Sequence, residues 1–304
     1  MISCILTAYQ EPRTVGVSIK ALLEQDWPEA YEILVVCPDT ETATVVRIFT
    51  ECYPQVRQLI DTGEGKPAAL NLALKHIRGH ICVFSDGDVL VQENAIAELL
   101  APFEQPECGA VTGRPISANP RTSCFGYWSH LLTDAGAHYI RTRNAQQRRY
   151  LDCSGYLYAA RSFLLTAMPL ETLADDAYIS QLVWQQGYVL AYAPEARVAV
   201  RYPTTYKDWL LQKVRSSAGA AMTPPPLHPN DQRYVRPPEH MRSFQREALT
   251  GLYSALTYAQ SWHEQWWTCC LLIARIHLWL CVWLELHIKH RSRQDIWQRV
   301  ETTK

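Results

Sequence analysis

The chain has 304 residues, of which 48% are hydrophobic and 19% charged, and its formal net charge is −1. This length allows one large core or two domains. A charge so close to zero excludes the global basic field that favours nucleic acid. None of the ten cysteines belongs to a Cys-x-x-Cys pair, so we expect reduced thiols in a cytosolic environment, without structural zinc or disulfides.

Strand-like and helix-like segments alternate through the first ninety residues. Apolar runs bounded by turn residues predict strands at 2–7, 31–37, 56–60 and 81–84. Apolar residues at helical spacing predict helices from about 11 to 22, 41 to 52 and 68 to 74. Because strands that alternate with helices form parallel sheets with right-handed crossovers, we predict an α/β nucleotide-binding half over residues 1–90.

Residues 91–222 continue this α/β pattern as a second half of the same domain. The predicted strands are 109–113, 188–192 and 196–202, with a strand-and-turn segment at 152–156. The predicted helices are 122–147, 175–186 and 206–221. A proline-rich stretch over 223–238 is predicted to be a linker, and 239–304 a helical tail.

Two carboxylates, Asp86 and Asp88, stand two residues apart where the fourth predicted strand ends. Open α/β sheets bind their ligands at this end of the strands, and Gly87 allows a tight turn between the two acids. Carboxylate oxygens suit Mg²⁺ or Mn²⁺, which then keeps positions open for phosphate oxygens. An acidic turn without a ligand remains the alternative.

Several motifs occur in an order that resembles the family-2 glycosyltransferases, which have the GT-A fold. They cover roughly residues 2–220. In chain order they are Thr7-Ala8-Tyr9-Gln10-Glu11, Asp39, Gly65-Lys66 before Ala69-Leu70-Asn71, Asp86-Gly87-Asp88, Cys153-Ser154-Gly155, Asp175-Asp176 and Gln212-Lys213-Val214-Arg215. The ordered set is much more specific than any single motif.

The resemblance implies a role for each of these positions. The donor nucleotide sugar would be bound by Ala8, Tyr9, Glu11, Asp39, Lys66, Asp86, Gln212 and Arg215. The acceptor side would include Gly155 and Asp175, which makes residues 91–222 the acceptor half. Asp88, with Asp86, would hold the Mn²⁺ or Mg²⁺ ion, and Asp176 would be the catalytic base.

This set of residues fits a one-step transfer that inverts the sugar. Metal at Asp88 and the cations of Lys66 and Arg215 would neutralise the diphosphate as the glycosidic bond breaks. Asp176 would take the proton of the acceptor hydroxyl. Asp175 and Asp176 are adjacent at a helix start, so they point in different directions and only one can face the acceptor. Ser216 stands where processive synthases have a tryptophan, which predicts short products.

Two other kinds of protein stay open. The segment Asp86-Gly87-Asp88 also resembles the first motif of haloacid-dehalogenase-type phosphatases, although those enzymes usually begin with that strand. A non-catalytic binding relic of a sugar-nucleotide enzyme is the other. Taken singly, Glu11, Asp39 and the Asp175-Asp176 pair could be ordinary acids at helix N-termini.

The apolar stretch Trp266–Leu284 raises the question of a membrane. As a helix, its nineteen residues would be roughly 28 Å long, close to a bilayer core, but Arg275 would cost roughly 2.5–3.5 kcal/mol at its centre. A span with Lys289, Arg291 and Arg293 inside would place the site away from cytosolic donors. We therefore expect a tail on the cytoplasmic membrane face, near a glycan or lipid-linked acceptor. Packing on the domain is the alternative.

Overall fold

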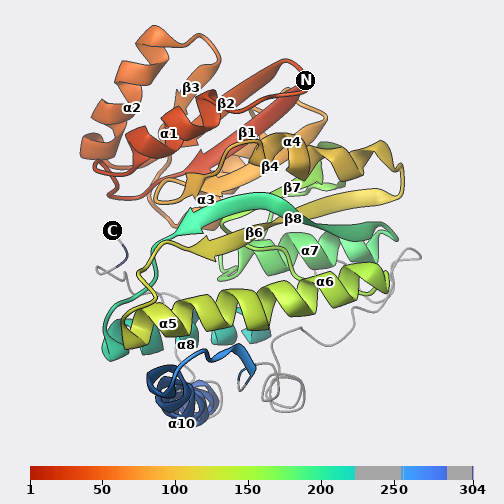
Figure 1. The fold of residues 1–304 in the computed structure, drawn as a ribbon. Helices are drawn as coiled ribbons and strands as arrows, with labels where there is room; N and C mark the ends of the chain where they lie inside the picture. Colours follow the sequence, from red (N-terminus) through yellow and green to blue (C-terminus); the bar gives the residue numbers. More distant parts are fainter. Residues whose placement is uncertain (223–254, 256, 286–302, 304) are drawn as a thin grey trace.

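The computed structural model describes residues 1–222, 255, 257–285 and 303. Within them, one sheet of eight strands crosses the protein, with helices on both of its faces (Figure 1). The strands are β1 (Ile2–Thr7), β2 (Tyr31–Val36), β3 (Val56–Leu59), β4 (Ile81–Asp86), β5 (Leu90–Val91), β6 (Cys108–Ser117), β7 (Leu157–Arg161) and β8 (Val189–Val200). Their order in the sheet is β3-β2-β1-β4-β7-β6-β8-β5.

The helices follow the strands in the alternation that the sequence predicts for the first half. They are α1 (Val15–Leu23), α2 (Thr40–Cys52), α3 (Lys66–Leu74), α4 (Ala95–Leu100), α5 (Cys124–Leu131), α6 (Tyr139–Gln146), α7 (Asp175–Gln185), α8 (Tyr206–Met222) and α10 (Trp262–Leu284). Shorter turns are η1 (Ala101–Glu104), η2 (Leu132–His138) and η3 (Ser162–Leu164).

The first half of the sheet is parallel, as the strand–helix alternation predicts. Thr7 at the end of β1 is in register with Val36 of β2 and with Asp86 of β4. The carboxyl ends of these three strands therefore lie at one edge, which is where open α/β sheets place their ligands.

The second half departs from a parallel arrangement because β7 runs antiparallel between β4 and β6. β6 and β8 pair in parallel, with a shift in register after Thr112. Pro194 lies inside β8 within this irregularity, where no ladder hydrogen bond is needed. A Cβ on Gly113 would lie 2.6 Å from the carbonyl oxygen of Ala196, so glycine allows this close approach.

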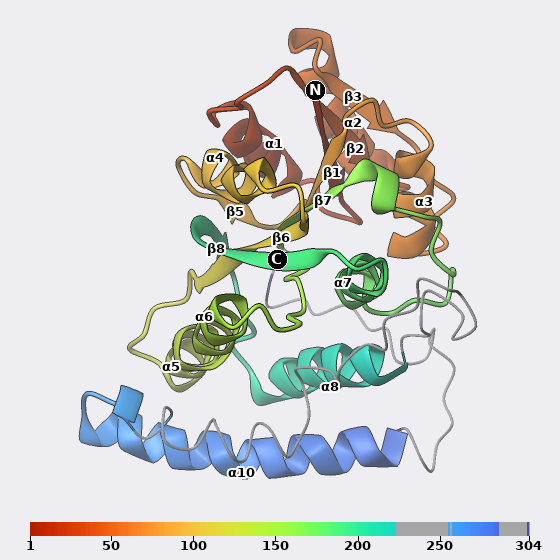
Figure 2. The ribbon, with the colours of Figure 1, turned by 90° about the vertical axis from the view of Figure 1, so that its right-hand side faces the viewer.

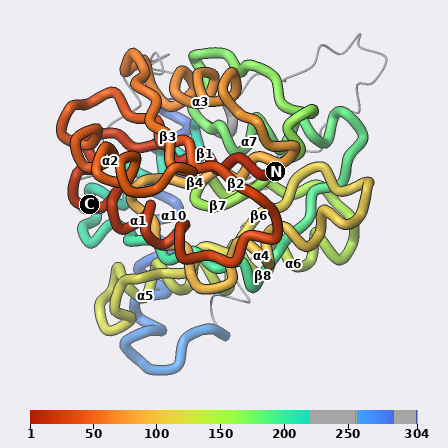
Figure 3. The backbone as a smooth tube through the Cα atoms, turned by 90° about the horizontal axis from the view of Figure 1, so that it is seen from above, coloured from red at the N-terminus to blue at the C-terminus, as the bar shows by residue number. Residues whose placement is uncertain are grey.

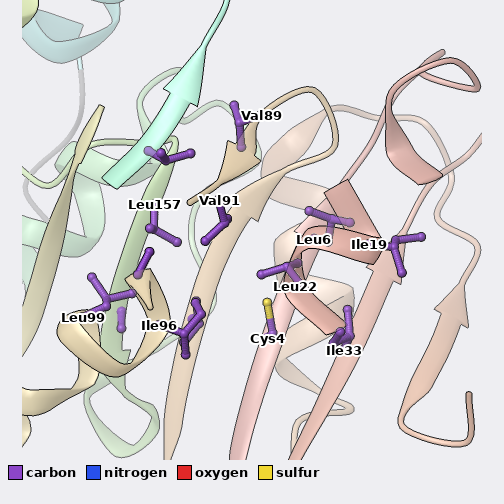
Figure 4. Packing of buried hydrophobic residues seen from close by; sticks show 14 of the residues in the cluster. Cys4, Leu6, Ile19, Leu22, Ile33, Val89, Val91, Ile96, Leu99 and Leu157 are labelled. Atoms are coloured by element: carbon purple, nitrogen blue, oxygen red, sulfur yellow. The ribbon is translucent and has the colours of Figure 1, made fainter. Parts of the chain in front are cut away.

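Apolar side chains fill both faces of the sheet. On one face, α1, α2 and α4 pack on the strands, and Figure 4 shows Leu6, Ile19 and Leu99 within this cluster. On the other face, α3 and α7 bury Leu70 and Ile179. Both faces of the strands are thus covered, which explains their nearly continuous apolar sequences.

A third cluster joins α5 and α8 to the C-terminal helix α10. Tyr127, Trp128 and Trp209 are buried there against Leu271 and other residues of α10. In Figure 2, α7, α8 and α10 form successive layers below the sheet. The tail helix is therefore packed on the α/β domain, and one face of it contributes to the core.

Several predicted boundaries differ from the structure. The strands predicted at 188–192 and 196–202 form the single strand β8, because the bulge accommodates Pro194. The predicted strand-and-turn segment at 152–156 is a loop, with β7 beginning at Leu157. The helix predicted from residue 11 starts at Val15 after a turn. β5 and α4 were not predicted. The linker 223–238, most of the tail 239–304 and the basic residues Lys289, Arg291 and Arg293 lie outside the described residues.

Candidate functional site

The turn after β4 is held against the loop after β1. The Gly87 N–H donates to the Thr7 carbonyl at 2.8 Å, and the Thr7 hydroxyl donates to Asp86 Oδ1 at 3.2 Å. A Cβ on Gly87 would lie 2.7 Å from the Ala8 Cβ and 2.6 Å from Glu11 Oε2. Glycine is therefore required here by close packing, and it brings the predicted residues Ala8, Glu11 and Asp86 to one place.

Asp39 joins the loop after β1 to the start of α2. Its Oδ1 accepts the Thr42 N–H at 2.9 Å, which makes Asp39 the N-cap of α2, and its Oδ2 accepts the Gln10 N–H at 2.8 Å. Burial raises the pKa of Asp39, but the hydrogen bonds from Thr42 and Gln10 lower it more, so that its net pKa is below the ordinary value. Asp39 therefore caps a helix, as the second interpretation of this residue predicted. Tyr9, in the loop after β1, is exposed.

Lys66 makes contacts that the sequence does not predict. Its Nζ lies 2.8 Å from Asp86 Oδ1 and 3.2 Å from Asp175 Oδ2. Burial lowers the pKa of Lys66, but the carboxylates of Asp175 and Asp86 raise it more, so the ammonium stays charged. Lys66 thus joins the end of β4 to the start of α7, and the diphosphate contact expected of it together with Arg215 stays a prediction.

Asp175 and Asp176 begin α7, and their carboxylates have different partners. Asp175 faces Lys66 and also accepts the Tyr158 hydroxyl at 3.3 Å. Burial raises the pKa of Asp175, and Lys66 offsets only part of this effect. Asp176 instead accepts the Gly155 N–H at Oδ2 (3.0 Å) and the Ala177 N–H at Oδ1 (2.9 Å). The divergence expected of adjacent acids at a helix start is therefore present.

Asn71 holds α3 against the segment that leads into α7. Its side-chain NH₂ donates to the Met168 carbonyl at 2.8 Å, and its Oδ1 accepts the Met168 N–H at 2.9 Å. In the view of Figure 3, α3 and α7 lie near one another, and both contribute to the same apolar cluster. The Asn71 of the family-like segment thus positions Lys66 for its contact with Asp175.

Asp86 and Asp88 are both half-buried at the end of β4. Their donor atoms are oxygens, as a hard divalent cation requires. Among the described residues, no group of three or more His, Cys, Asp or Glu side chains could hold a metal. The two acids therefore supply only part of the ligand set that a hard divalent cation takes. Asp86 Oδ1 is in addition engaged by Lys66 and Thr7.

Gln212 and Arg215 are half-buried on α8. The ion pairs that join Lys66, Asp86 and Asp175 do not include them. Within the described part of the chain, Gln212 Oε1 is buried without a hydrogen-bond partner. Sequence reasoning missed Tyr158, because its contact depends on β7 lying beside β4. It also missed Thr7, whose register with Asp86 follows from aligning the ends of β1 and β4.

This arrangement is that of an α/β domain with an acidic site at the strand ends. The family model of "Glycosyltransferase like family 2" matches residues 2–219. The chain therefore belongs to glycosyltransferase family 2. This assignment lends no support to the phosphatase alternative.

Curated proteins with similar sequences include a probable glycosyltransferase and a polysaccharide synthase. The chain is 24% identical over 245 residues to the probable glycosyltransferase YdaM of Bacillus subtilis, covering 72% of this chain and 54% of that protein. It is 23% identical over 224 residues to the poly-β-1,6-N-acetyl-D-glucosamine synthase of Staphylococcus epidermidis, with 72% and 54% covered. The chain thus spans about half the length of these curated relatives.

The fold is shown by a solved structure. The mannosyltransferase PcManGT of Pyrobaculum calidifontis, in complex with GDP-Man and Mn²⁺, superposes with a TM-score of 0.60 at 20% identity. The match covers 95% of this chain and 81% of that protein. The predicted GT-A fold, with a C-terminal helix added to it, is confirmed.

Proposed function

We propose that the protein is an inverting glycosyltransferase that moves a sugar from a nucleotide diphosphate to an acceptor hydroxyl. The observation that carries this proposal is the contact between the two halves of the site. Asp86 from the donor half and Asp175 from the acceptor half share Lys66, and Asp176 lies next to Asp175 with its carboxylate on Gly155. Donor and acceptor would meet between these residues.

The donor half would bind the nucleotide diphosphate with the loop after β1 and the turn after β4. Ala8, Tyr9, Glu11 and Asp39 belong to this edge, and Asp88 with Asp86 would hold Mn²⁺ or Mg²⁺ there. When bound, the cation supplies a positive charge that stabilises the leaving diphosphate. Lys66 is near enough to Asp86 to move onto a diphosphate oxygen, with Gln212 and Arg215 from α8 as further partners.

Asp176 is the group proposed to take the acceptor proton. The acceptor oxygen forms a bond to the anomeric carbon while the bond from that carbon to the diphosphate breaks, and the hydroxyl proton passes to Asp176. The Gly155 and Ala177 N–H groups hold the Asp176 carboxylate in place. Asp175 is already bound to Lys66 and Tyr158, which favours Asp176 as the base.

A screen of UDP-, GDP- and dTDP-sugars with Mn²⁺ tests this proposal. We expect release of the nucleoside diphosphate from one donor class, loss of release with EDTA, and loss of transfer in Asp176→Asn. Donor binding by the variant should persist, because an amide keeps the shape of the side chain. Release of free phosphate would indicate a phosphatase, and donor binding without turnover would indicate a non-catalytic relic.

We also propose that transfer is non-processive. Ser216 follows Arg215 and donates to the Lys213 carbonyl at 3.2 Å, so it offers no aromatic surface for a growing sugar chain. The expected products carry one or a few added sugars. Mass spectrometry of products made by the purified enzyme checks this, and a long polymer would contradict it.

The proposed location is the cytoplasmic face of the cell membrane, where cytosolic donors and a glycan or lipid-linked acceptor meet. Among the described residues, one helix, Trp262–Leu284, is long and apolar enough to cross a bilayer. It lies against α5 and α8, which supports association with one face of the membrane.

A further inference from the structure

The C-terminal helix α10 has two faces of different character. Its inner face, which includes Thr268, Leu271, Leu278 and Val282, is buried against α5 and α8. Its outer face carries large apolar side chains that are more than half exposed. We name the outer stripe by its residues: Trp262, Trp266, Cys269, Ile273, Ile276, Leu280 and Trp283.

The outer stripe is regular along the whole helix. Its residues follow one another at alternating steps of four and three, which keeps them on one side of an α-helix. Trp262 is 83% exposed, Ile273 69% and Trp283 51%. Such a long, apolar, exposed surface marks an interaction site.

We infer that the outer stripe docks on the surface of a lipid bilayer, with α10 lying in the membrane plane and the catalytic domain on one side. This goes beyond the proposed location because it assigns the docking surface and its orientation. Tryptophans stand at both ends of the stripe, and such side chains favour the headgroup region. The basic residues Lys289, Arg291 and Arg293 follow in the sequence and complement anionic lipids.

The inner face argues against a transmembrane span. Arg121 from the segment before α5 donates to both carboxylate oxygens of Glu264, at 2.7 and 3.0 Å, and the Tyr127 and Thr268 hydroxyls lie 2.7 Å apart. Farther along the helix, the Tyr206 hydroxyl lies 2.7 Å from His277 Nδ1. These contacts hold α10 along the domain, so it cannot also cross a bilayer without breaking them.

Arg275, the residue that makes a span costly, is placed where an in-plane helix tolerates it. It follows Leu271 by four residues and precedes Leu278 by three, both of which are buried, so it lies on the inner half of α10. It is half-buried and about 200° around the helix from Ile273. Its charge therefore stays on the protein side when the stripe meets lipid.

A second copy of this chain is the other occupant to consider, because the spacing of the stripe also suits a coiled coil. A coiled coil places charged residues beside its apolar seam to select the partner. From Gln265 to Leu284 the only charged side chain is Arg275, on the inner half. The apolar outer arc is also wider than a two-position seam, since half-buried Leu272 and Leu284 extend it. A bilayer fits this surface better.

The docked orientation would bring the catalytic site close to the lipid. α8 packs on α10 through Trp209 and Val214. The far end of α8 reaches the segment before α7, because a Cβ on Gly219 would lie 3.1 Å from the Leu173 Cβ. One helix layer, roughly 8–10 Å between axes, thus separates α10 from the segment that leads into Asp175. A headgroup-linked acceptor would reach the site from this side.

Vesicle flotation of the full chain tests the inference without any nucleotide sugar, so that failure of the proposed enzymatic function leaves the result readable. We expect the protein to bind phosphatidylcholine vesicles that contain phosphatidylglycerol. Its binding to vesicles of pure phosphatidylcholine should be weaker. The triple variant Trp266→Gln, Ile273→Gln, Leu280→Gln keeps the net charge and helix propensity and should bind at least roughly tenfold more weakly.

The matched control is Val17→Gln with Ile48→Gln, which removes two equally exposed apolar side chains from α1 and α2, far from α10. It should bind like the parent protein, and all variants should keep the parent melting temperature. Substitution is preferred to truncation because removal of α10 would expose Tyr127 and Trp209.

Three results would overturn the inference. The first is no vesicle binding by the parent protein, or equal binding by the triple variant. The second is a concentration-dependent dimer, without vesicle binding, that the triple variant abolishes, since this identifies a second copy as the occupant. The third is a tag after Lys304 that protease cleaves from outside the cell while a tag before Met1 is protected, since this indicates a span.

Discussion

Lys66 sits between two carboxylates that come from different halves of the domain. Asp86 ends a central parallel strand, and Asp175 begins a helix that the chain reaches only after β7 has been inserted antiparallel beside β4. Without the lysine, two buried or half-buried acids would face each other. The same cation that is proposed to meet a diphosphate therefore also stabilises the pair of carboxylates.

We predict that Lys66→Met lowers the free energy of unfolding at neutral pH by roughly 1–3 kcal/mol, because the two carboxylates lose their shared cation. The matched control is Lys20→Met, whose exposed pair with Glu24 at 3.7 Å should contribute less than about 0.5 kcal/mol. Denaturant unfolding of both variants measures the difference. Equal effects would contradict a stabilising role for Lys66.

The pH dependence of this difference follows from the pKa values. Because the pKa of Lys66 is raised, its contribution is fully present at neutral pH and is lost only above the ordinary lysine pKa of about 10.4. On the acid side, protonation of Asp175 removes its pair with Lys66. Burial raises the pKa of Asp175, so this loss begins above the ordinary aspartate pKa of about 3.9. The difference in the free energy of unfolding between the parent protein and Lys66→Met should therefore become smaller as the pH falls.

Asp86 is bound to Lys66 and Thr7, so its loss would remove these contacts together with one acid of the turn. We predict that Asp88→Ala lowers metal-dependent turnover at least roughly 100-fold while the melting temperature stays within a few degrees. Asp86→Ala should lower both, because it also removes the partner of Lys66. Steady-state turnover across a Mn²⁺ titration, with thermal unfolding alongside, makes the comparison. Undiminished transfer by Asp88→Ala, with metal still required, would exclude Asp88 as a ligand.

At the scale of the element, the turn after β4 depends on Gly87 as much as on its acids. The Ser18 hydroxyl of α1 donates to the Gly87 carbonyl at 3.1 Å and to the Val89 carbonyl at 2.7 Å. The turn is thus held by hydrogen bonds from α1 and packs closely against Ala8 and Glu11. A small shift in this turn moves both acids at once.

We predict that Gly87→Ala costs roughly 1–3 kcal/mol of stability and lowers donor affinity, because the new Cβ would lie 2.7 Å from the Ala8 Cβ. Gly136→Ala in η2 is the control, since its nearest neighbour is the Leu131 carbonyl at 3.9 Å. That control should be neutral or slightly stabilising. Calorimetry of donor binding and of unfolding measures both effects, and equal behaviour of the two variants would argue against a packed turn.

At the scale of the whole molecule, the sequence predicts the parts that depend on local pattern and strand ends. The apolar runs fix β1, β2 and β4, and parallel pairing then places Asp39 and Asp86 at one edge. The Lys66–Asp175 contact could not be predicted, because it needs the antiparallel β7 and the clamp between Asn71 and Met168. The apolar sequence of α10 also does not show which side of this helix packs on the domain.

α10 is attached to the domain by an ion pair at its first turn. Glu264 at the start of α10 accepts two hydrogen bonds from Arg121 and one from the Gln260 N–H. The hydrogen bonds from Arg121 lower the pKa of Glu264 below the ordinary glutamate value. A lowered pKa in the folded state contributes stability above the ordinary value of about 4.3, and this contribution is lost as the pH falls through the folded-state pKa.

We therefore predict that Glu264→Gln lowers the melting temperature at neutral pH by about 2–4 °C and that the gap closes on acidification, because glutamine resembles the protonated acid. Tyr127 and Trp128 are buried between α5 and α10, so we expect one cooperative transition that includes α10 in both proteins. Calorimetry from neutral to acidic pH measures the gap, and near-ultraviolet circular dichroism reports the packing of these aromatic rings. A separate early transition for α10 would show that the helix is an independent appendage, and a gap that does not depend on pH would exclude the Arg121–Glu264 pair as its cause.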